Sequence, residues 1–126
     1  MKSKLTYTGI RVKNIDESVK FYVDLLGMKE VGRSKIEAAG GEVVNLESEP
    51  GGHSIELNYY SPESKFYSNY VSGEGLDHLA FQVEDLDKAL EEAKKAGYPM
   101  KLEMKGKTSR WAYIEDPNGI FIELFT

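Results

Sequence analysis

Two glutamates lie inside strand-like segments that have nearly the same local sequence. Glu56 stands between isoleucine and leucine in "HSIELNYY" at 53–60, and Glu123 stands between the same residue types in "IFIELFT" at 120–126. A single strand glutamate is usually exposed or paired with a lysine, because an unpaired buried carboxylate costs free energy. Repetition at matching places favours a shared chemical role instead. A bound divalent cation would neutralise both carboxylates.

The elements around the two glutamates repeat in the same order. Strand-like alternation, a helical pattern and a closing glycine run through "YTGIRVKNIDESVKFYVDLLGM" from residue 7 and again through "DHLAFQVEDLDKALEEAKKAGY" from Asp77. The helical period gives each helix one apolar face, with Ile15, Val19, Tyr22, Val23 and Leu26 in the first and Leu86, Ala89, Leu90 and Ala93 in the second. The expected helix ends are Asn14 or Asp16 as the first N-cap, and Gly27 and Gly97 as the C-terminal stops.

Three strand-like segments follow each helix. They are 29–36, 41–48 and 53–60 in the first half, and 100–105, 109–115 and 120–126 in the second. "DPNG" at 116–119 is the expected tight turn before the last strand. We therefore predict an α+β fold with two tandem βαβββ modules. Module one covers about 5–60, a linker rich in Ser, Gly and Tyr covers 61–75, and module two covers about 76–126.

Length and composition limit the class of protein. A chain of 126 residues suits a single domain, here built from both modules. The net charge of −5, with both signs interspersed, gives no basic footprint for nucleic acid, and no segment is apolar enough for a signal peptide or a membrane span. The chain has no cysteine, which excludes disulfides and thiolate ligands. We expect a cytoplasmic protein with a small-molecule substrate and with no nucleic-acid or membrane partner.

Period-two alternation places four polar side chains at equivalent positions of four strands. One face of each strand is aliphatic and is expected to pack on the helices. On the opposite face Tyr7 corresponds to His78 under the repeat, and Glu56 corresponds to Glu123. A pseudo-twofold arrangement of the modules would bring these four together. Imidazole and carboxylate groups form a ligand set for Zn²⁺, Ni²⁺, Co²⁺, Mn²⁺ or Fe²⁺.

Other polar and aromatic residues leave more than one interpretation open. An isolated histidine is usually structural or at the surface, and His53 is expected to be exposed in the turn after "EPGG". Arg11 is either a solvated strand charge or an anion anchor at the edge of the site. Trp111 and Tyr113 either wall a pocket or simply pack.

The stretches "FYVDLLGM", "SIELNYY", "DHLAFQVED" and "IEDPNGIFIEL", with the duplicated pattern, resemble the vicinal oxygen chelate superfamily over essentially the whole chain, and its glyoxalase I family most of all. This resemblance implies a curved mixed sheet around a central cavity, with the helices on the outer face. It also implies a divalent metal ion (Ni, Zn, Co or Mn) held by Glu56, His78 and Glu123. The first family ligand is usually histidine, so Tyr7 is expected beside the metal, either as a neutral phenol or as a fourth ligand.

The resemblance implies a reaction as well. We expect a metal-dependent lyase or isomerase in which Glu123 or Glu56 moves a proton through a metal-bound enediolate. The substrate would be a small α-hydroxycarbonyl or a thiol adduct. Its expected contacts are Arg11, Tyr7, Asn58 and Tyr60. Arg11 matches an arginine that contacts the glutamyl carboxylate of glutathione in that family, whereas Tyr60 replaces the partner asparagine.

Other functions within the superfamily compete with this one. The acyl-CoA epimerase family has histidine and glutamine at its first two ligand positions, and this chain has neither there. Loss of the first histidine disfavours an iron dioxygenase. A dimer like the bleomycin-resistance proteins would bind a small molecule without metal, which the aromatic linker suits and the retained ligand set does not. We expect a homodimer, because short two-module members commonly combine modules of different chains. A site completed within one chain remains the alternative.

Overall fold

The computed structural model of the chain describes residues 2, 6–74, 76, 78–106 and 108–126. The chain divides into two compact units, unit one (residues 1–69) and unit two (residues 70–126). Residues 5, 75 and 77, which bound the predicted modules, linker and repeat, lie outside the described residues. Over the described ranges, no helix is both long and apolar enough to cross a bilayer.

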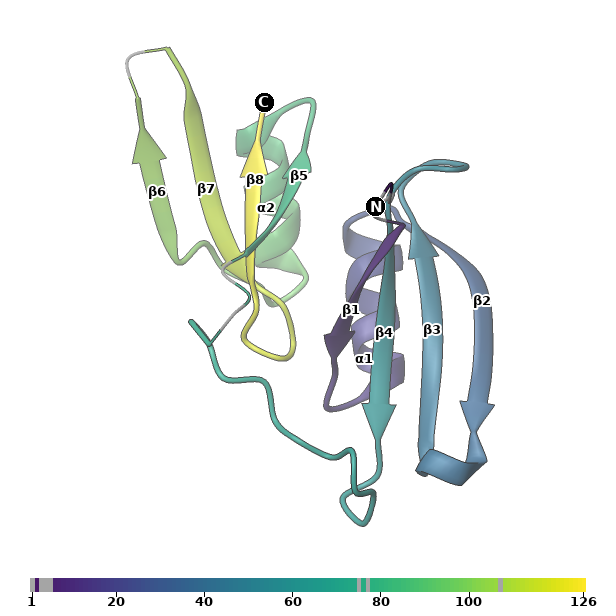
Figure 1. Ribbon diagram of the computed structural model, residues 1–126. Helices are drawn as coiled ribbons and strands as arrows, with labels where there is room; N and C mark the ends of the chain where they lie inside the picture. The colour runs from purple at the N-terminus through teal and green to yellow at the C-terminus, as the bar shows by residue number, and fades with distance from the viewer. Residues whose placement is uncertain (1, 3–5, 75, 77, 107) are drawn as a thin grey trace. The chain divides into compact units, whose positions relative to one another are not determined.

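The two units share the order strand, α-helix and three strands, to which unit one adds the short helical turns η1 and η2. Unit one has β1 (Tyr7–Arg11), α1 (Ile15–Lys20), η1 (Phe21–Leu25), β2 (Lys29–Ile36), η2 (Glu37–Ala39), β3 (Gly41–Glu47) and β4 (Ser54–Tyr60). Unit two has β5 (His78–Gln82), α2 (Leu86–Lys95), β6 (Leu102–Lys105), β7 (Arg110–Glu115) and β8 (Phe121–Phe125). The described strands form two four-stranded sheets, in the orders β1-β4-β3-β2 and β5-β8-β7-β6 (Figure 1). The predicted α+β fold of two βαβββ modules is confirmed.

Both sheets are mixed, and their registers match. β1 runs parallel to β4 and β5 runs parallel to β8, whereas the other neighbouring strands are antiparallel. Glu56 lies beside Gly9 in the first parallel pair, and Glu123 lies beside Ala80 in the second. The repeat read from the sequence is therefore a structural repeat in which the two glutamates occupy equivalent places.

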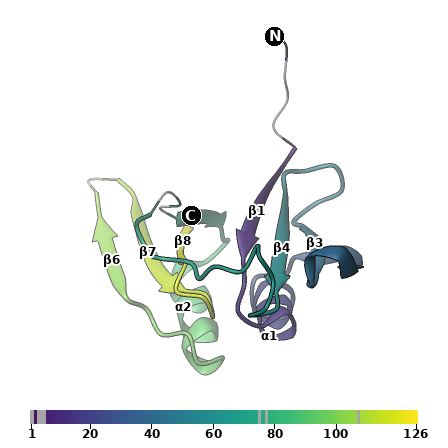
Figure 2. The same cartoon turned by 60° about the horizontal axis from the view of Figure 1, so that its bottom comes forward.

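Each helix packs on one face of its own sheet, as both views show (Figures 1 and 2). α1 contacts β3 and β4, and α2 contacts β7 and β8. The aliphatic strand residues on these faces are buried: Ile10, Val44, Leu46, Ile55 and Leu57 in unit one, and Ala112, Ile114, Ile122 and Leu124 in unit two. Alternation along the strands leaves Glu56 and Glu123 on the opposite faces, where both are half-buried.

The ends of the first helix lie where the sequence predicts them. Asn14 is the N-cap, and its Oδ1 accepts a hydrogen bond of 3.0 Å from the Glu17 backbone N–H. This contact satisfies one of the N–H groups that a helix start leaves unpaired. Gly27 follows the last turn with a φ of 73°, a left-handed conformation that glycine adopts without strain.

The buried face of the first helix differs from the prediction. After α1 the chain widens into the π-helical turn η1, in which the Leu26 N–H donates to the Phe21 carbonyl at 3.3 Å. A turn closed by i→i+5 bonds rotates the following side chains relative to the assumed period of 3.6. Of the predicted residues, Ile15 and Tyr22 are buried, whereas Val23 and Leu26 at the turn and Val19 before it are half-buried. Ser18 and Phe21 are buried in addition.

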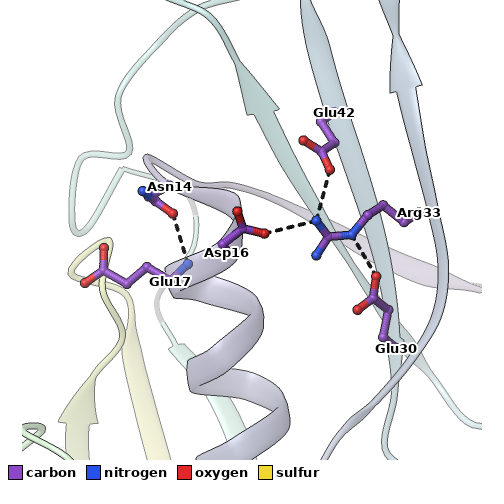
Figure 3. Close-up of polar contacts among 6 residues, drawn as sticks. All are labelled: Asn14, Asp16, Glu17, Glu30, Arg33 and Glu42. Carbon is purple, nitrogen blue, oxygen red and sulfur yellow. Dashed lines mark hydrogen bonds and ion pairs between the residues drawn. The ribbon is translucent and has the colours of Figure 1, made fainter.

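An arginine ties the start of α1 to the edge of the first sheet. Arg33 of β2 pairs with Asp16 at 3.0 Å, with Glu30 at 2.8 Å and with Glu42 of β3 at 3.1 Å (Figure 3). The hydrogen bonds that Arg33 donates to Glu30 and Asp16 hold the pKa of its guanidinium above the ordinary value. Four charged groups from three elements therefore hold the helix start against the two strands.

Unit two repeats this ion cluster with two charges exchanged. Arg110 of β7 pairs with Asp87 at 2.6 Å, near the start of α2, and with Glu103 of β6. By sheet register, Glu103 occupies the place of Arg33, and Arg110 occupies the place of Glu42. Both units thus fix the helix start with an arginine, but from different strands.

The Asp87–Arg110 pair makes stability depend on pH. The hydrogen bond from Arg110 lowers the pKa of the Asp87 carboxyl below its ordinary value. A lowered folded-state pKa stabilises the fold above the unfolded value of about 4, and this stabilisation is lost as the pH falls through the folded-state value. We expect Asp87→Asn to be less stable than the wild type at pH 7 and equally stable near pH 2, by urea unfolding. The exposed Asp24→Asn is the control. If Asp87→Asn is less stable than the wild type by the same free energy of unfolding at pH 7 and near pH 2, the ion-pair explanation is wrong.

Candidate functional site

A polar cluster lies on the face of the second sheet away from α2. His78 of β5 and Glu123 of β8 approach at 3.4 Å between Nε2 and Oε2. The Tyr113 hydroxyl of β7 donates a hydrogen bond of 2.7 Å to the same Oε2. The side chains of His78 and Glu123 keep 33% and 20% of their surface exposed, so a ligand can reach them. Three neighbouring strands thus supply an imidazole, a carboxylate and a phenol at one place.

Aromatic contacts order this cluster. The ring of Tyr113 meets the His78 ring edge-on, with centroids 5.7 Å apart and planes at 80°. It meets Phe121 in the same manner at 6.1 Å and 75°. Edge-to-face contacts of this kind are favourable and directional. The phenol of Tyr113 is therefore held by two rings while its hydroxyl faces Glu123.

An apolar cavity of about 330 Å³ adjoins the cluster. Its lining residues are Leu102, Met104, Trp111, Tyr113 and Phe121, all from β6, β7 and β8. Trp111 and Tyr113 therefore wall a pocket, which was one of the two interpretations that the sequence left open. Because Tyr113 belongs to both cavity and cluster, an apolar group in the cavity would lie next to a molecule held at Glu123.

Unit one presents the corresponding pair, Tyr7 and Glu56. Tyr7 lies opposite Ser54 in the β1–β4 register, as His78 lies opposite Phe121 in the β5–β8 register. Tyr7 is 51% exposed and therefore accessible, whereas Glu56 is half-buried. The Asn58 side chain, an expected substrate contact, donates to the Glu56 backbone carbonyl at 3.0 Å. Asn58 thus orders β4 beside Glu56.

Arg11 and Tyr60, two further expected substrate contacts, lie together in unit one. The Arg11 guanidinium carbon is 4.5 Å from the centroid of the Tyr60 ring, a cation–π contact. Arg11 also donates a hydrogen bond to the Phe66 carbonyl, in the first part of the predicted linker. Tyr60 and Phe66 stack at 5.8 Å between centroids. Arg11 is therefore not a freely solvated charge, and its role as an anion anchor stays a prediction.

The donor chemistry of the predicted residues suits a divalent metal ion. Unit two brings an imidazole nitrogen and a carboxylate oxygen together, and unit one carries Glu56 at the place equivalent to Glu123. Among the described residues, no three His, Asp or Glu side chains form a cluster that could hold a metal. His78 and Glu123 are brought together, and the addition of Glu56 and Tyr7, which would join the two units, stays a prediction.

The sequence interpretation missed two contacts, one at Glu123 and one at His53. The Tyr113–Glu123 hydrogen bond follows from cross-strand pairing, since the two residues are direct register partners in β7 and β8. Aligning the two "IEL" strands with their preceding strands would have given that pairing. His53 is exposed as expected, but its Nε2 shares a hydrogen bond of 2.8 Å with the Thr8 hydroxyl.

Comparisons with known proteins cover almost the whole chain. The family model of the Glyoxalase/Bleomycin resistance protein/Dioxygenase superfamily matches residues 4–124. A probable lactoylglutathione lyase of Synechocystis is 34% identical and aligns over 95% of this chain and 92% of its own, and one of Vibrio parahaemolyticus is 30% identical over 96% and 88%. The solved structure of the trypanothione-dependent glyoxalase I of Leishmania major has a TM-score of 0.83 and 28% identity, and covers 99% of this chain and 87% of that chain. These relatives support an enzyme of the lactoylglutathione lyase (glyoxalase I) type.

Proposed function

The chain belongs to the Glyoxalase/Bleomycin resistance protein/Dioxygenase superfamily, and on that premise we propose that it is a metal-dependent lyase or isomerase of the glyoxalase I type. Curated relatives at about 30% identity that are named lactoylglutathione lyase support the proposal. The observation that carries it is the contact of His78 with Glu123, which lies beside an apolar cavity. The substrate class is a small α-hydroxycarbonyl or a thiol adduct.

Glu56, His78 and Glu123 would hold the divalent ion, with Ni, Zn, Co and Mn as the candidates. The ion supplies Lewis-acid polarisation of a substrate oxygen when it is bound. His78 presents Nε2 to the site, and the edge-on contact with Tyr113 keeps its ring oriented. Tyr7 stands where a fourth ligand is expected. We propose that it stays a neutral phenol that donates a hydrogen bond to a substrate or water oxygen.

Proton transfer falls to a glutamate carboxylate. In the proposed reaction Glu123 or Glu56 accepts the proton from the carbon next to the substrate carbonyl and returns it to the neighbouring carbon. Both carboxylates are half-buried, so water is partly excluded from them and the substrate can still approach. The apolar cavity of unit two would take the apolar substituent of the carbonyl compound.

The thiol part of the substrate is less restricted. Arg11, the expected contact of a glutathione carboxylate, already donates to the Phe66 carbonyl and stacks on Tyr60. A thiol carboxylate must compete with that carbonyl for the guanidinium. The proposed class therefore includes adducts of thiols other than glutathione.

A metal-reconstitution assay tests the proposed function. We expect chelator-treated protein to be inactive on the hemithioacetal of methylglyoxal and glutathione, or of a second thiol, and to regain activity with at least one of Ni²⁺, Zn²⁺, Co²⁺ and Mn²⁺. Thioester formation is followed by its ultraviolet absorbance, and metal content is measured on the same samples. The proposal includes a cytoplasmic homodimer, so light scattering should give twice the chain mass. Protein that takes up no metal and turns over neither adduct would favour the metal-free binding alternative.

A further inference from the structure

We propose that Tyr113 is a positioning residue that fixes one oxygen of the Glu123 carboxylate and so presents the other oxygen to the ligand of the site. The inference rests on the proposed function, since it assigns a role within that site. The Tyr113 hydroxyl donates to Glu123 Oε2 at 2.7 Å, a short hydrogen bond to a charged acceptor. Such bonds to a carboxylate set its orientation as well as its energy.

Two groups converge on the same carboxylate oxygen. Oε2 accepts from Tyr113, and it is also the oxygen that lies 3.4 Å from His78 Nε2. Oε1 is thus the oxygen through which a cation or a proton would bind Glu123 without displacing Tyr113. The phenol therefore determines which carboxylate oxygen binds the cation or the proton.

The phenol itself is held in place. Tyr113 is the direct register partner of Glu123, so the two side chains leave adjacent strands side by side. The rings of His78 and Phe121 both make edge-on contacts with the Tyr113 ring. These contacts fix the rotamer of Tyr113, and a residue that positions a metal ligand must itself be fixed by packing.

The internal repeat offers a comparison within the chain. Glu56 has Asn45 as its register partner in β3, at the place that Tyr113 takes in β7. An asparagine has no phenol hydroxyl to donate from that place. The two glutamates are therefore supported differently, and the support by a phenol belongs to Glu123.

Removal of the hydroxyl alone tests the inference. Tyr113→Phe keeps the ring that packs on His78 and Phe121, and loses the bond to Glu123. The matched control is Tyr70→Phe in the same unit, which loses a hydrogen bond of 3.0 Å from its hydroxyl to the Leu76 carbonyl. Loss of an outer-shell partner weakens metal binding by about 10–100-fold. We expect roughly tenfold weaker binding of Zn²⁺ and Ni²⁺ in Tyr113→Phe by chelator competition, and no change in Tyr70→Phe.

A second readout does not need metal. In chelator-treated protein labelled with ¹³C at the glutamate carboxyl, the Glu123 resonance, assigned with Glu123→Gln, should shift in Tyr113→Phe and stay in place in Tyr70→Phe. Unchanged metal affinity in Tyr113→Phe, or an unmoved resonance, overturns the inference. If the wild type binds no metal, the proposed function is wrong, and the resonance alone then decides whether Tyr113 holds the carboxylate.

Discussion

Asp116→Ala is expected to lower the free energy of unfolding by about 3 kcal/mol. Asp116 is 4% exposed and begins the turn between β7 and β8. Its Oδ1 accepts hydrogen bonds of 2.8 Å from the backbone N–H groups of Asn118 and Ile120, and its Oδ2 accepts one of 2.9 Å from the Asn118 side chain. Alanine would leave these donors buried without their charged acceptor. Urea unfolding at pH 7 measures the loss.

The repeat supplies the matched control for Asp116. Glu49 holds the corresponding place in the turn between β3 and β4, since its carbonyl accepts from Gly52 at 3.0 Å as the Asp116 carbonyl accepts from Gly119 at 3.0 Å. Glu49 is exposed. Glu49→Ala should therefore change the stability by less than about 0.5 kcal/mol. Equal losses of stability in the two variants would show that the buried carboxylate is not what stabilises the β7–β8 turn.

Glu56→Gln combined with Glu123→Gln is expected to weaken divalent-metal binding by more than about 100-fold. Loss of even a residue that only hydrogen-bonds to a metal ligand weakens binding by about 10–100-fold. The double change removes both negative charges that would compensate the cation, and it removes both candidate bases. Activity in the reconstitution assay should disappear with it. Isothermal titration of metal into the chelator-treated protein gives the affinity.

A second glutamate pair controls for the loss of charge alone. Glu47 of β3 and Glu115 of β7 occupy equivalent places, opposite Ser54 and Phe121, and both are half-buried. Glu47→Gln with Glu115→Gln removes the same charge from the neighbouring strands, so it should leave metal affinity within about threefold of the wild type. Stoichiometric metal in the Glu56/Glu123 double variant would show that the ligands lie elsewhere.

Most of the fold could be predicted from the sequence because two periods and one repeat describe it. The predicted strand 29–36 coincides with β2, and 53–60 begins one residue before β4. Glycines at positive φ end both helices, as their positions in the pattern suggested. The buried face of the first helix was predicted correctly at Ile15 and Tyr22 and wrongly at Val23 and Leu26, because a fixed period of 3.6 contains no π-helical turn.

The candidate site could be predicted only in part, for a related reason. Alternation within a strand places Glu123 and His78 on one face, and the structure brings them together. Alternation gives the face of a residue but not the register between strands. It therefore does not identify Tyr113 as the residue opposite Glu123. Arg11 shows the same limit, because its partner, the Phe66 carbonyl, depends on the path of a segment without secondary structure.

The exchanged charges of the two ion clusters affect how well a strand of one half could pair with a strand of the other half. Equivalent strands of a repeat are similar enough to compete for one another during folding. If β2 paired with β7, Arg33 would lie near Arg110, and if β6 paired with β3, Glu103 would lie near Glu42. Like charges across a strand pair are destabilising. Among these four side chains, only strands of the same half bring opposite charges together.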